Sequence, residues 1–416
     1  MTGSLKPAGR CRLCDAPLEQ TLVDLGLSPL ANSYVRAERA GIPDNFYPLH
    51  ARVCGNCFLV QVDDVVPAGE IFNSEYAYFS SFSESWLDHC RRFASAAVSR
   101  FRLGPQSLVV EIASNDGYLL QYFAEAGVRV LGVEPAANVA AAAEAKGVKT
   151  RVAFFSEELA KKLRAEGEAP DLICSANVLA HVPDIADFAR GVAALLTGEA
   201  VYTVEFPHLF NMIELVQFDT IYHEHYSYLS LTAVENLFAR TGLRVFDVEE
   251  IPTHGGSLRV YACLKDATRP ETPAVAALRT KERAAKLDRL DGYEGYDARV
   301  KKVREGLLDY LAQAKKEGRK VAAYGAAAKG NTLLNYCGVG AADIAYVVDR
   351  NPAKQGTLLP GSRIPVRPVE ALHEDQPDDI LILPWNIKDE VVSQLADLKK
   401  QGVRFLVAIP ELAVVG

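Results

Sequence analysis

The stretch LVVEIASNDGYLLQYFAEAGVRVLGVE, residues 108–134, decides the fold of this chain. Its first five residues form a short apolar run rich in β-branched side chains, which is typical of a buried parallel strand. The SNDG sequence at 114–117 then predicts a tight turn, in which Gly117 permits a ligand to approach the backbone closely. Helical periodicity over 118–126 and a second apolar run over 129–133 complete a strand–turn–helix–strand unit.

The second predicted strand of this unit ends on an acid, Glu134, roughly 20 residues after the turn. An acid in that place binds the two ribose hydroxyls of a nucleoside, so the spacing indicates a cofactor such as NAD or S-adenosylmethionine (SAM). A βαβ unit that binds no ligand is the less favoured alternative, because the acid and a polar turn occur together.

The composition of the turn favours SAM over NAD. A dinucleotide site needs glycines so that the pyrophosphate can lie on the helix N-terminus, and here other residues fill most of the turn. Glu111 and Asp116 add negative charge where a pyrophosphate would lie, whereas a sulfonium cation with an amino group is the better electrostatic partner. The predicted SAM-binding residues of this unit are Glu111, Ser114, Asn115, Asp116, Gly117 and Glu134.

Length and composition set the broad class of protein. The 416 residues predict two or three domains, and 49% hydrophobic residues are enough to bury a large core. A net charge of −8 and a pI of about 5.6 argue against a general nucleic-acid-binding protein. No apolar stretch resembles a signal peptide or is long enough to span a bilayer, so a soluble, cytoplasmic protein without a membrane partner is expected.

Two C-x2-C pairs, Cys11/Cys14 and Cys54/Cys57, predict a zinc site in a small N-terminal lobe. Four thiolates suit tetrahedral zinc and leave no position open for a substrate, so the expected zinc is structural. A redox role is less favoured, because neither pair opens a helix after a strand. The other cysteines are expected to be buried thiols: Cys90, Cys174, Cys263 and Cys337.

Aromatic and hydroxyl residues cluster at EYAYFSS, residues 75–81. They indicate either a pocket for a base or sugar or a packing hinge onto the next domain, and the pattern alone does not separate the two. An amphipathic helix is predicted over 86–102, leading into the domain that contains the 108–134 unit.

Strands and helices alternate after this unit, with helices predicted at 138–146, 157–166 and 185–196 and strands at 171–176 and 200–205. This order predicts a doubly wound α/β sheet, in which ligands bind outside the carboxyl ends of the strands. Asn177 and His181 follow one such end. Asn177 is therefore a candidate for SAM binding and His181 for the chemistry, although a lone histidine in this position is more often structural.

The densest chemical cluster is DTIYHEHYSY, residues 219–228. It lacks the i, i+4 histidines of a zinc-protease helix, which leaves three interpretations: a metal site with ligands from elsewhere, acid–base chemistry, or a structural polar loop. In the acid–base interpretation one histidine is the base, and Glu224 orients or raises the basicity of a neighbouring group. If the segment is a strand, His223 and His225 share one face and Tyr222 and Glu224 the other.

Two further segments precede the C-terminal part of the chain. HGGSLRVY at 254–261 predicts a tight turn and a strand, in which Arg259 either holds an anion or forms a structural ion pair. Residues 267–318 are rich in alanine and in charges of alternating sign, which predicts a solvated helical connector or a dimerising face.

A second α/β unit is predicted over 319–416. Its first strand ends near 325, and further strands are predicted at 344–349, 379–383 and 404–409. A helix is expected to begin near Thr332. Lys329, Gly330, Asn331 and Thr332 at that helix N-terminus would make a phosphate cradle. The lysine precedes the second glycine, so the spacing is not that of an ATP-hydrolysing P-loop. The alternative is a decayed duplicate that only packs.

Together these motifs resemble one known family, the SAM-dependent sugar C-methyltransferases of antibiotic deoxysugar pathways. The resemblance covers nearly the whole chain, and it is closest to the C-3-methyltransferase branch that serves the biosynthesis of the branched nitro sugar tetronitrose. It rests on the four cysteines of the zinc pairs, EIASNDGYLL at 111–120, YHEH at 222–225, HGGSLR at 254–259 and GAAAKGNT at 325–332. One departure is Ala113, where related methyltransferases usually have glycine.

The resemblance implies a zinc-binding lobe over 1–75, a SAM-binding Rossmann-like domain over 76–266 and, after the 267–318 connector, a Rossmann-like domain over 319–416 that helps to bind the substrate. The implied substrate is a thymidine diphosphate (TDP)-linked 4-keto-deoxysugar. By resemblance, His225 is the base, a choice over His223 that spacing alone would not make. The residues implied to contact the nucleotide-sugar are Tyr76, Tyr78, Ser80 and Lys329.

The implied reaction is methylation at C3 of a 4-keto-2,3,6-trideoxyhexose that carries a 3-amino group. The C4 ketone acidifies the C3 proton, a base removes it, and the enolate carbon attacks the SAM methyl group in line. His225 would remove the proton, Tyr222 and Glu224 would position it or stabilise the C4 oxygen, and His181 would be a secondary acid–base or orienting group. An NAD-dependent nucleotide-sugar oxidoreductase is the alternative enzyme, and a non-enzymatic zinc scaffold is a more distant one. The sequence leaves the C3 substituent, the stereochemistry and the oligomeric state open, with a monomer expected.

Overall fold

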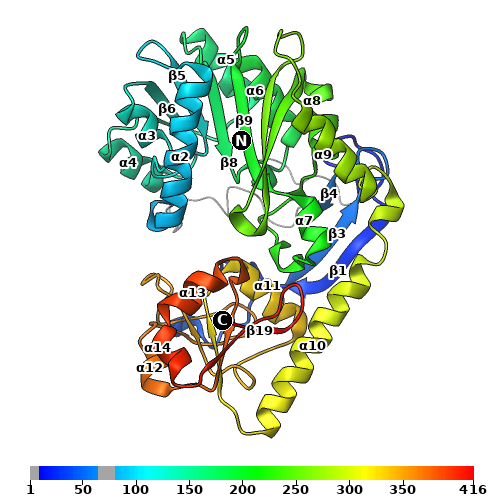
Figure 1. Ribbon diagram of the computed structural model, residues 1–416, viewed down its shortest axis with the longest axis vertical. Helices are drawn as coiled ribbons and strands as arrows, with labels where there is room; N and C mark the ends of the chain where they lie inside the picture. The colour runs from blue at the N-terminus through cyan, green and yellow to red at the C-terminus, as the bar shows by residue number, and fades with distance from the viewer. Residues whose placement is uncertain (1–8, 64–79) are drawn as a thin grey trace.

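The computed structural model describes residues 9–63 and 80–416 (Figure 1). A seven-stranded sheet forms the larger domain, a six-stranded sheet forms the C-terminal domain, and a small four-stranded sheet lies beside both. The long helix α10 (Tyr296–Lys316) runs from the larger domain along the side of the C-terminal one. Tyr76 and Tyr78, and the domain boundary expected at residue 75, lie outside the described residues.

The seven-stranded sheet has the order β11-β12-β9-β8-β5-β6-β7. Its parallel strands are β5 (Leu108–Ile112), β6 (Arg129–Glu134), β7 (Thr150–Val152), β8 (Leu172–Ala176) and β9 (Val201–Pro207). The predicted strands are confirmed, and β11 (Leu243–Ile251) is an additional strand that pairs antiparallel with β12 (Ser257–Leu264) at one edge. The strand order reverses between β5 and β8, and such a switch point is where ligands bind in open α/β sheets.

Helices cover both faces of this sheet. One layer consists of α2 (Glu84–Phe101), α3 (Leu120–Glu125) and α4 (Ala137–Ala145), and the other of α5 (Glu157–Ala165), α6 (Ile185–Leu195) and α8 (Leu231–Thr241). Val109 packs in the first layer and Val110 in the second. Both faces are buried, which is why the strands have continuous apolar sequences.

The C-terminal sheet has the order β16-β14-β13-β17-β18-β19. Its parallel strands are β13 (Val321–Tyr324), β14 (Val347–Val348), β16 (Val366–Arg367), β17 (Asp379–Ile382) and β18 (Arg404–Val407), and β19 (Ala413–Val415) is antiparallel. Helix α11 (Ala328–Cys337) follows β13 and begins before Thr332, so the expected helix start was wrong. The switch point here lies between β13 and β17.

The N-terminal lobe is tied to both domains. Its sheet has the order β1-β3-β4-β10 and contains β1 (Gln20–Ser28), β3 (Tyr47–Val53) and β4 (Val60–Val62). The fourth strand, β10 (Ser227–Tyr228), belongs to the 219–228 cluster, and β2 (Val35–Arg36) pairs with β15 (Thr357–Leu358) of the C-terminal domain. The end of the 219–228 cluster is therefore a strand of the N-terminal sheet.

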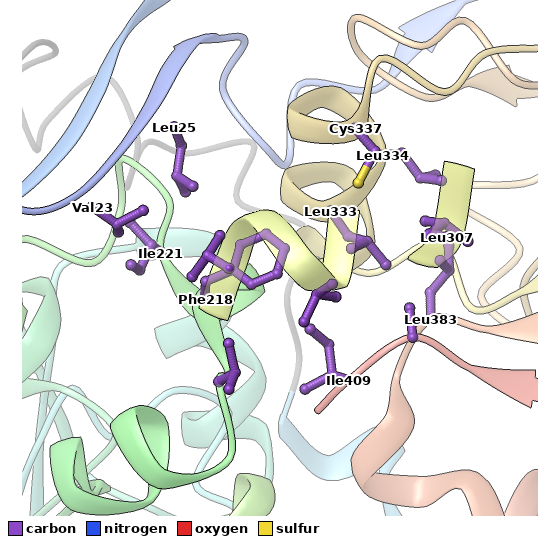
Figure 2. Packing of buried hydrophobic residues seen from close by; sticks show 14 of the residues in the cluster. Val23, Leu25, Phe218, Ile221, Leu307, Leu333, Leu334, Cys337, Leu383 and Ile409 are labelled. Carbon is purple, nitrogen blue, oxygen red and sulfur yellow. The ribbon is translucent and has the colours of Figure 1, made fainter. Parts of the chain in front are cut away.

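The segment 267–318, predicted as a solvated helical connector or a dimerising face, is helical, but one side of its helices is buried rather than solvated. Helix α9 (Pro273–Ala284) packs on α8 and β11, and α10 buries one side in the largest apolar cluster. Leu307 of α10 shares that cluster with Leu25 of β1 and Leu333 of α11 (Figure 2). Charged side chains on the outer face of α10 had hidden its apolar stripe. In the described part of the chain, no helix combines the length and apolarity that crossing a membrane requires.

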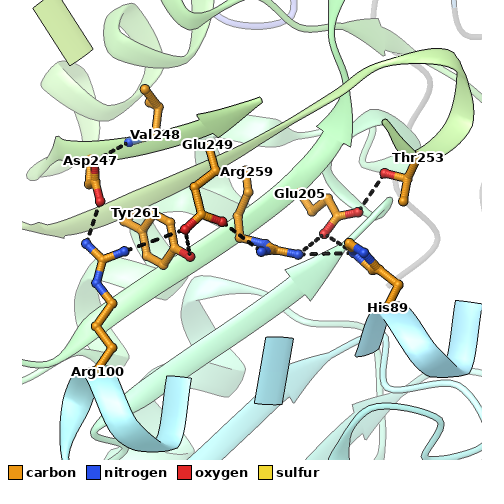
Figure 3. A network of polar contacts seen from close by, with 9 residues as sticks. All are labelled: His89, Arg100, Glu205, Asp247, Val248, Glu249, Thr253, Arg259 and Tyr261. Atoms are coloured by element: carbon orange, nitrogen blue, oxygen red, sulfur yellow. Dashed lines mark hydrogen bonds and ion pairs between the residues drawn. The ribbon is translucent and has the colours of Figure 1, made fainter. Parts of the chain in front are cut away.

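A buried polar network joins α2 to the large sheet (Figure 3). Arg259 of β12 donates at 2.9 Å to Glu205 of β9 and at 2.9 Å to Glu249 of β11, and His89 of α2 lies 2.9 Å from Glu205. Both sides of the Arg259 guanidinium are therefore used by carboxylates. Of the two roles open from the sequence, the structural ion pair is the one observed.

Candidate active site

The two C-x2-C pairs come together as predicted. Their sulfur atoms all lie within 4.8 Å of one another, with Cys11 and Cys57 at 3.5 Å and Cys14 and Cys54 at 3.4 Å. Zinc–sulfur bonds of about 2.3 Å in a tetrahedron place sulfur atoms about 3.8 Å apart, so the cluster fits one zinc ion. Since all four ligands are thiolates, this zinc is structural.

The turn after β5 has an unusual backbone. Ala113, Asn115 and Gly117 all have positive φ, at 56°, 48° and 78°. The carboxylate of Glu134 accepts hydrogen bonds from the Asn115 backbone N–H at 3.0 Å and the Ala136 N–H at 2.8 Å, and burial raises the pKa of Glu134. The acid thus lies at the end of β6 beside the turn, where a ribose-binding acid is expected.

Three of the predicted SAM-binding side chains face inward. Ser114 is fully buried against β6, where a Cβ on Gly132 would lie 2.3 Å from its Oγ. Glu111 is also fully buried, and burial holds its pKa well above the usual range, while Asp116 is paired with Lys146 at 3.0 Å. The negative charge of Glu111 and Asp116 is therefore largely neutralised. The electrostatic argument that this charge favours a sulfonium over a pyrophosphate is corrected accordingly.

Asn115 also fixes the segment that leaves the N-terminal lobe. Its Oδ1 accepts from the backbone N–H of Ser80 at 2.9 Å. Ser80 begins the short helical turn η2 (Ser80–Phe82), so this predicted substrate-binding residue lies directly against the predicted cofactor turn. The roles of Ser80 and of the SAM-binding residues stay predictions.

Asn177 follows β8 at the switch point and has a positive φ of 57°. Its Nδ2 donates to Nε2 of His254 at 3.0 Å. Its Oδ1 is buried and has no hydrogen-bond partner among the described residues, which suits an acceptor for the amino group of a bound amino-acid tail. His181 lies nearby and donates from Nδ1 to the Glu224 carbonyl at 2.8 Å, and burial lowers the pKa of His181 to about 4.

His225 is held in one tautomer by a chain of hydrogen bonds. Its Nδ1 lies 3.0 Å from the Thr220 carbonyl, which can only accept, so Nδ1 carries the proton. Its Nε2 therefore accepts from the Tyr222 hydroxyl at 2.8 Å. Burial and the neighbouring His181, whose ring centroid is 4.6 Å away, hold the pKa of His225 well below its usual range. His225 is a neutral imidazole whose unprotonated nitrogen, Nε2, faces Tyr222.

The remaining members of the cluster point elsewhere. Residues 218–225 form the short helix η4 (Phe218–Thr220) and a turn, so the alternation of faces that a strand would give does not apply here. His223 donates to the Pro48 carbonyl at 3.1 Å, on the side of the N-terminal lobe. Glu224 accepts from Asn32 at 2.6 Å, and burial raises the pKa of Glu224 to about 7. Among the described residues, no metal-binding cluster includes these histidines.

Lys329 reaches this region from the C-terminal domain. It lies in the first turn of α11, where Nζ donates to Asn386 Oδ1 at 2.7 Å and sits 4.5 Å from the centre of the Trp385 ring. The rest of the predicted phosphate cradle is wrong. Asn331 donates to the Ala31 carbonyl at 2.6 Å and Thr332 to the Ile221 carbonyl at 3.0 Å, so both side chains are buried in domain contacts.

Two residues near the site had no role predicted from the sequence. Asn32 contacts Glu224, which lies 192 residues further along the chain, and no local pattern marks such a contact. Trp385 follows the carboxyl end of β17, beside the switch point of its sheet, and that position was a signal available in the sequence.

These features define a class. A Rossmann-like sheet, an acid beside a polar turn at its switch point and a structural zinc lobe make this protein a SAM-dependent methyltransferase. The chain matches the families described as a putative zinc binding domain over 11–72, a methyltransferase domain over 86–248 and a C-methyltransferase C-terminal domain over 252–410.

Known proteins narrow the class further. The C-methyltransferase NovU of Streptomyces niveus is 35% identical over 415 residues, which covers 100% of this chain and 99% of that protein. A ubiquinone biosynthesis O-methyltransferase of Rhodopseudomonas palustris (strain BisA53) is 26% identical over 159 residues, 33% of this chain and 63% of that protein. The solved magnesium protoporphyrin IX methyltransferase of Synechocystis PCC 6803 with bound SAH has 15% identity and a TM-score of 0.35 over 42% of this chain and 82% of that chain, a likeness too low to bear on function. The chain belongs to the C-methyltransferase family and is a SAM-dependent C-methyltransferase.

Proposed function

We propose that this C-methyltransferase acts at C3 of a TDP-linked 4-keto-2,3,6-trideoxyhexose, with an amino group at C3, in the biosynthesis of a branched deoxysugar such as tetronitrose. The observation that carries the proposal is the neutral His225 imidazole, whose Nε2 accepts a hydrogen bond from the Tyr222 hydroxyl. A carbon acid beside a ketone needs such a base, whereas a hydroxyl or amine methylated directly has less need of one.

The protein keeps His225 in its basic form. Burial, His181 and the positive charge of Lys329 all lower the pKa of His225, so it is unprotonated at neutral pH and ready to accept a proton. Tyr222 lies on its Nε2, so the C3 proton travels either directly, after Tyr222 turns aside, or through the phenol of Tyr222. A Tyr222→Phe variant separates these routes, because only the second requires the hydroxyl.

Glu224 supports stabilisation of the enolate. With a pKa of about 7, a large share of this carboxyl is protonated at neutral pH and can donate to the C4 oxygen as negative charge develops. Asn32 fixes its other oxygen at 2.6 Å. His181, whose pKa is lowered to about 4 by burial, orients the turn through the Glu224 carbonyl and acts as a neutral group.

The cofactor and substrate residues come from three parts of the chain. Bound SAM supplies an electrophilic methyl group, and Asn115, Glu134 and Asn177 would hold its nucleoside and amino-acid ends. Lys329 would bind the diphosphate of the sugar nucleotide, together with Tyr76, Tyr78 and Ser80. An NAD-dependent oxidoreductase has no comparable support, because the turn at 113–117 lacks the glycines of a dinucleotide site.

The direct test is an assay of the zinc-loaded protein with SAM and TDP-linked 4-keto-2,6-dideoxyhexoses that carry a 3-amino or a 3-hydroxyl group. Mass spectrometry should show one added methyl group, and NMR should place it on C3. Methylation on nitrogen or oxygen, or no methylation of either sugar, would refute the proposal. Addition of NAD in place of SAM tests the oxidoreductase alternative in the same assay.

A further inference from the structure

Two glycine-containing turns from different domains make room for the same short segment, Leu383-Pro384-Trp385. A Cβ on Gly325 would lie 2.5 Å from Pro384 Cδ, and a Cβ on Gly330 would lie 2.8 Å from Leu383 Cβ. In the large domain, a Cβ on Gly255 would lie 2.3 Å from the Trp385 ring. Both turns are therefore shaped around this segment, which carries Trp385 into the contact between the domains.

Trp385 makes two polar contacts beyond this packing. Its indole Nε1 donates to Asp219 Oδ2 at 2.7 Å, and the Lys329 ammonium lies 4.5 Å from the ring centre. The next residue, Asn386, accepts from the same ammonium at 2.7 Å. Asp219 is fully buried, and the residue after it is Thr220, whose carbonyl fixes the tautomer of His225. The Trp385 indole therefore contacts both Lys329 of the C-terminal domain and the loop that orients His225.

The Trp385 ring also contacts the large domain, next to residues that follow the end of β8. The ring packs against Gly255, and the preceding residue, His254, accepts from Asn177 at the end of β8 at 3.0 Å. Gln217 donates to the Gly255 carbonyl at 2.8 Å. This contact ties the start of the proposed catalytic loop, residues 217–228, to the same turn. The two switch points are thus joined through Trp385 and the turn at 253–255.

We propose that Trp385 is a positioning residue that sets Lys329 and the catalytic loop relative to the SAM-binding domain. Lys329 is held on one face of the ring, and the loop of His225 is held through Asp219. A nucleotide-sugar bound to the C-terminal domain is thereby placed in register with the base and the methyl donor. This inference rests on the proposed function, because it assumes that Lys329 binds the nucleotide.

An apolar contact between domains would not need these polar features. Any large aliphatic side chain could fill the space between Gly255 and Pro384, but it could neither donate to a buried carboxylate nor offer a ring face to a cation, and the indole does both. Burial raises the pKa of Asp219 to about 6, so its carboxyl is mostly ionised at pH 7 and the hydrogen bond from Trp385 is charge-assisted.

Two substitutions at this position separate the contacts. Trp385→Phe keeps the ring face for Lys329 and removes the N–H, so kcat should fall roughly tenfold while the affinity for TDP changes little. Trp385→Leu removes both contacts, so the affinity for TDP should also fall roughly tenfold. Affinity is measured by calorimetric titration of the zinc-loaded full chain with TDP, and kcat and KM with the TDP-linked 4-keto-3-amino sugar.

A matched pair of glycine variants tests the packing. Gly255→Ala and Gly338→Ala both place alanine at a positive φ, 91° and 71°, but nothing lies within 4 Å of a Cβ at Gly338. Gly255→Ala should push the Trp385 ring away and weaken TDP binding as Trp385→Leu does, whereas Gly338→Ala should bind TDP as the wild type does. Unchanged zinc content and S-adenosylhomocysteine affinity show that each variant is folded.

The possible outcomes are distinct. If the wild type binds TDP and transfers methyl groups while Trp385→Leu and Gly255→Ala retain its kcat and TDP affinity, the positioning role is refuted and the proposed function stands. A parallel loss of S-adenosylhomocysteine affinity in these variants would also refute it, because the effect would then be general unfolding. If the wild type neither binds TDP nor methylates the sugar, the proposed function and this inference both fall.

Discussion

The two Rossmann-like sheets have the same turn after their first strands, with an acid bound to its backbone, but different groups surround the acid. In the large domain, Glu134 accepts from the backbone N–H of Asn115 at 3.0 Å; in the C-terminal domain, Asp349 accepts from the N–H of Ala326 at 2.8 Å. Each acid also accepts from the residue two places further along its own chain, at 2.8 Å in both cases. Turn, strand end and acid are thus equivalent in the two domains.

The difference lies in what covers the acid. Lys354 lies 3.7 Å from Asp349 and donates at 2.7 Å to the Ala326 carbonyl, which also accepts from Tyr34 of the N-terminal lobe at 2.5 Å. Among the described residues, the hydrogen bonds to the Glu134 carboxylate come from the backbone alone. Side chains of the protein itself thus contact both the acid and the turn of the second unit. An acid at a strand end is therefore a better sign of a nucleoside site where no cationic side chain of the protein is paired with it.

The largest expected effect comes from removing zinc, which tests whether the catalytic loop depends on the lobe rather than on either sheet. Strand β10 of that loop pairs with β4, which follows the second cysteine pair. Without zinc this pairing should loosen, and kcat should fall at least roughly 100-fold because the base is misplaced. A chelator-treated sample compared with a zinc-restored one gives the measurement.

In the same samples, the affinity for S-adenosylhomocysteine should stay near the wild-type value, because the turn at 113–117 lies in another sheet. Equal loss of cofactor binding and turnover would show that the lobe supports the whole molecule and not the loop.

The next largest effect is expected from substituting Glu134 and Asp349, the acids of the two sheets. Glu134→Ala should weaken S-adenosylhomocysteine binding roughly 10- to 100-fold, since Glu134 is the proposed ribose-binding acid and also accepts from the backbone of the turn. Asp349→Ala is the matched change in the second unit and should leave that affinity unaltered. Calorimetric titration of both variants with S-adenosylhomocysteine gives the affinities. A comparable loss of affinity in the two would mean that the C-terminal unit also takes part in the cofactor site.

A smaller effect concerns Glu224 and pH. Its pKa is about 7 in the folded protein against 4.5 for a free carboxyl, so the folded state binds the extra proton and stability falls as pH rises between these values. The linked loss is roughly 2 kcal/mol between pH 5 and 7. Glu224→Gln should lack this loss, so the difference in unfolding free energy between variant and wild type should change by that amount. A difference that is constant over this pH range would contradict the raised pKa.

The smallest effect is expected at Ala113, which occupies the place of Gly325 in the second unit. Both have positive φ, 56° and 89°, but alanine is strained there. Ala113→Gly should raise the free energy of unfolding by roughly 0.5–1 kcal/mol in urea denaturation. Gly127→Ala, with a φ of 76° and nothing within 4 Å of a Cβ, should lower it by a similar amount. A destabilised Ala113→Gly would show that the turn gains from its methyl group.

Much of the fold was predictable because its signals are local. Apolar runs give the buried parallel strands, and the cysteine spacing gives the zinc site. The short strand β19 and the edge strand β11 carried weaker patterns, and the outer charges of α10 hid its buried face. Each of these depends on partners far along the chain.

The candidate site was only partly predictable for the same reason. The cluster at 219–228 could be found from its composition, but not that His223 turns to the N-terminal lobe while His225 meets Tyr222. The inward turn of Asn331 and Thr332 depends on tertiary contacts that no helix-start pattern contains.

The central claim is that His225 removes the C3 proton, and hydrogen exchange at that carbon tests it most directly. The protein, loaded with zinc and S-adenosylhomocysteine, is incubated in heavy water with the TDP-linked 4-keto-3-amino sugar, and deuterium at C3 is followed by NMR. The wild type should exchange the C3 proton without methyl transfer, and His225→Asn should exchange it roughly 10²- to 10⁴-fold more slowly. Exchange at the wild-type rate in His225→Asn would contradict the account.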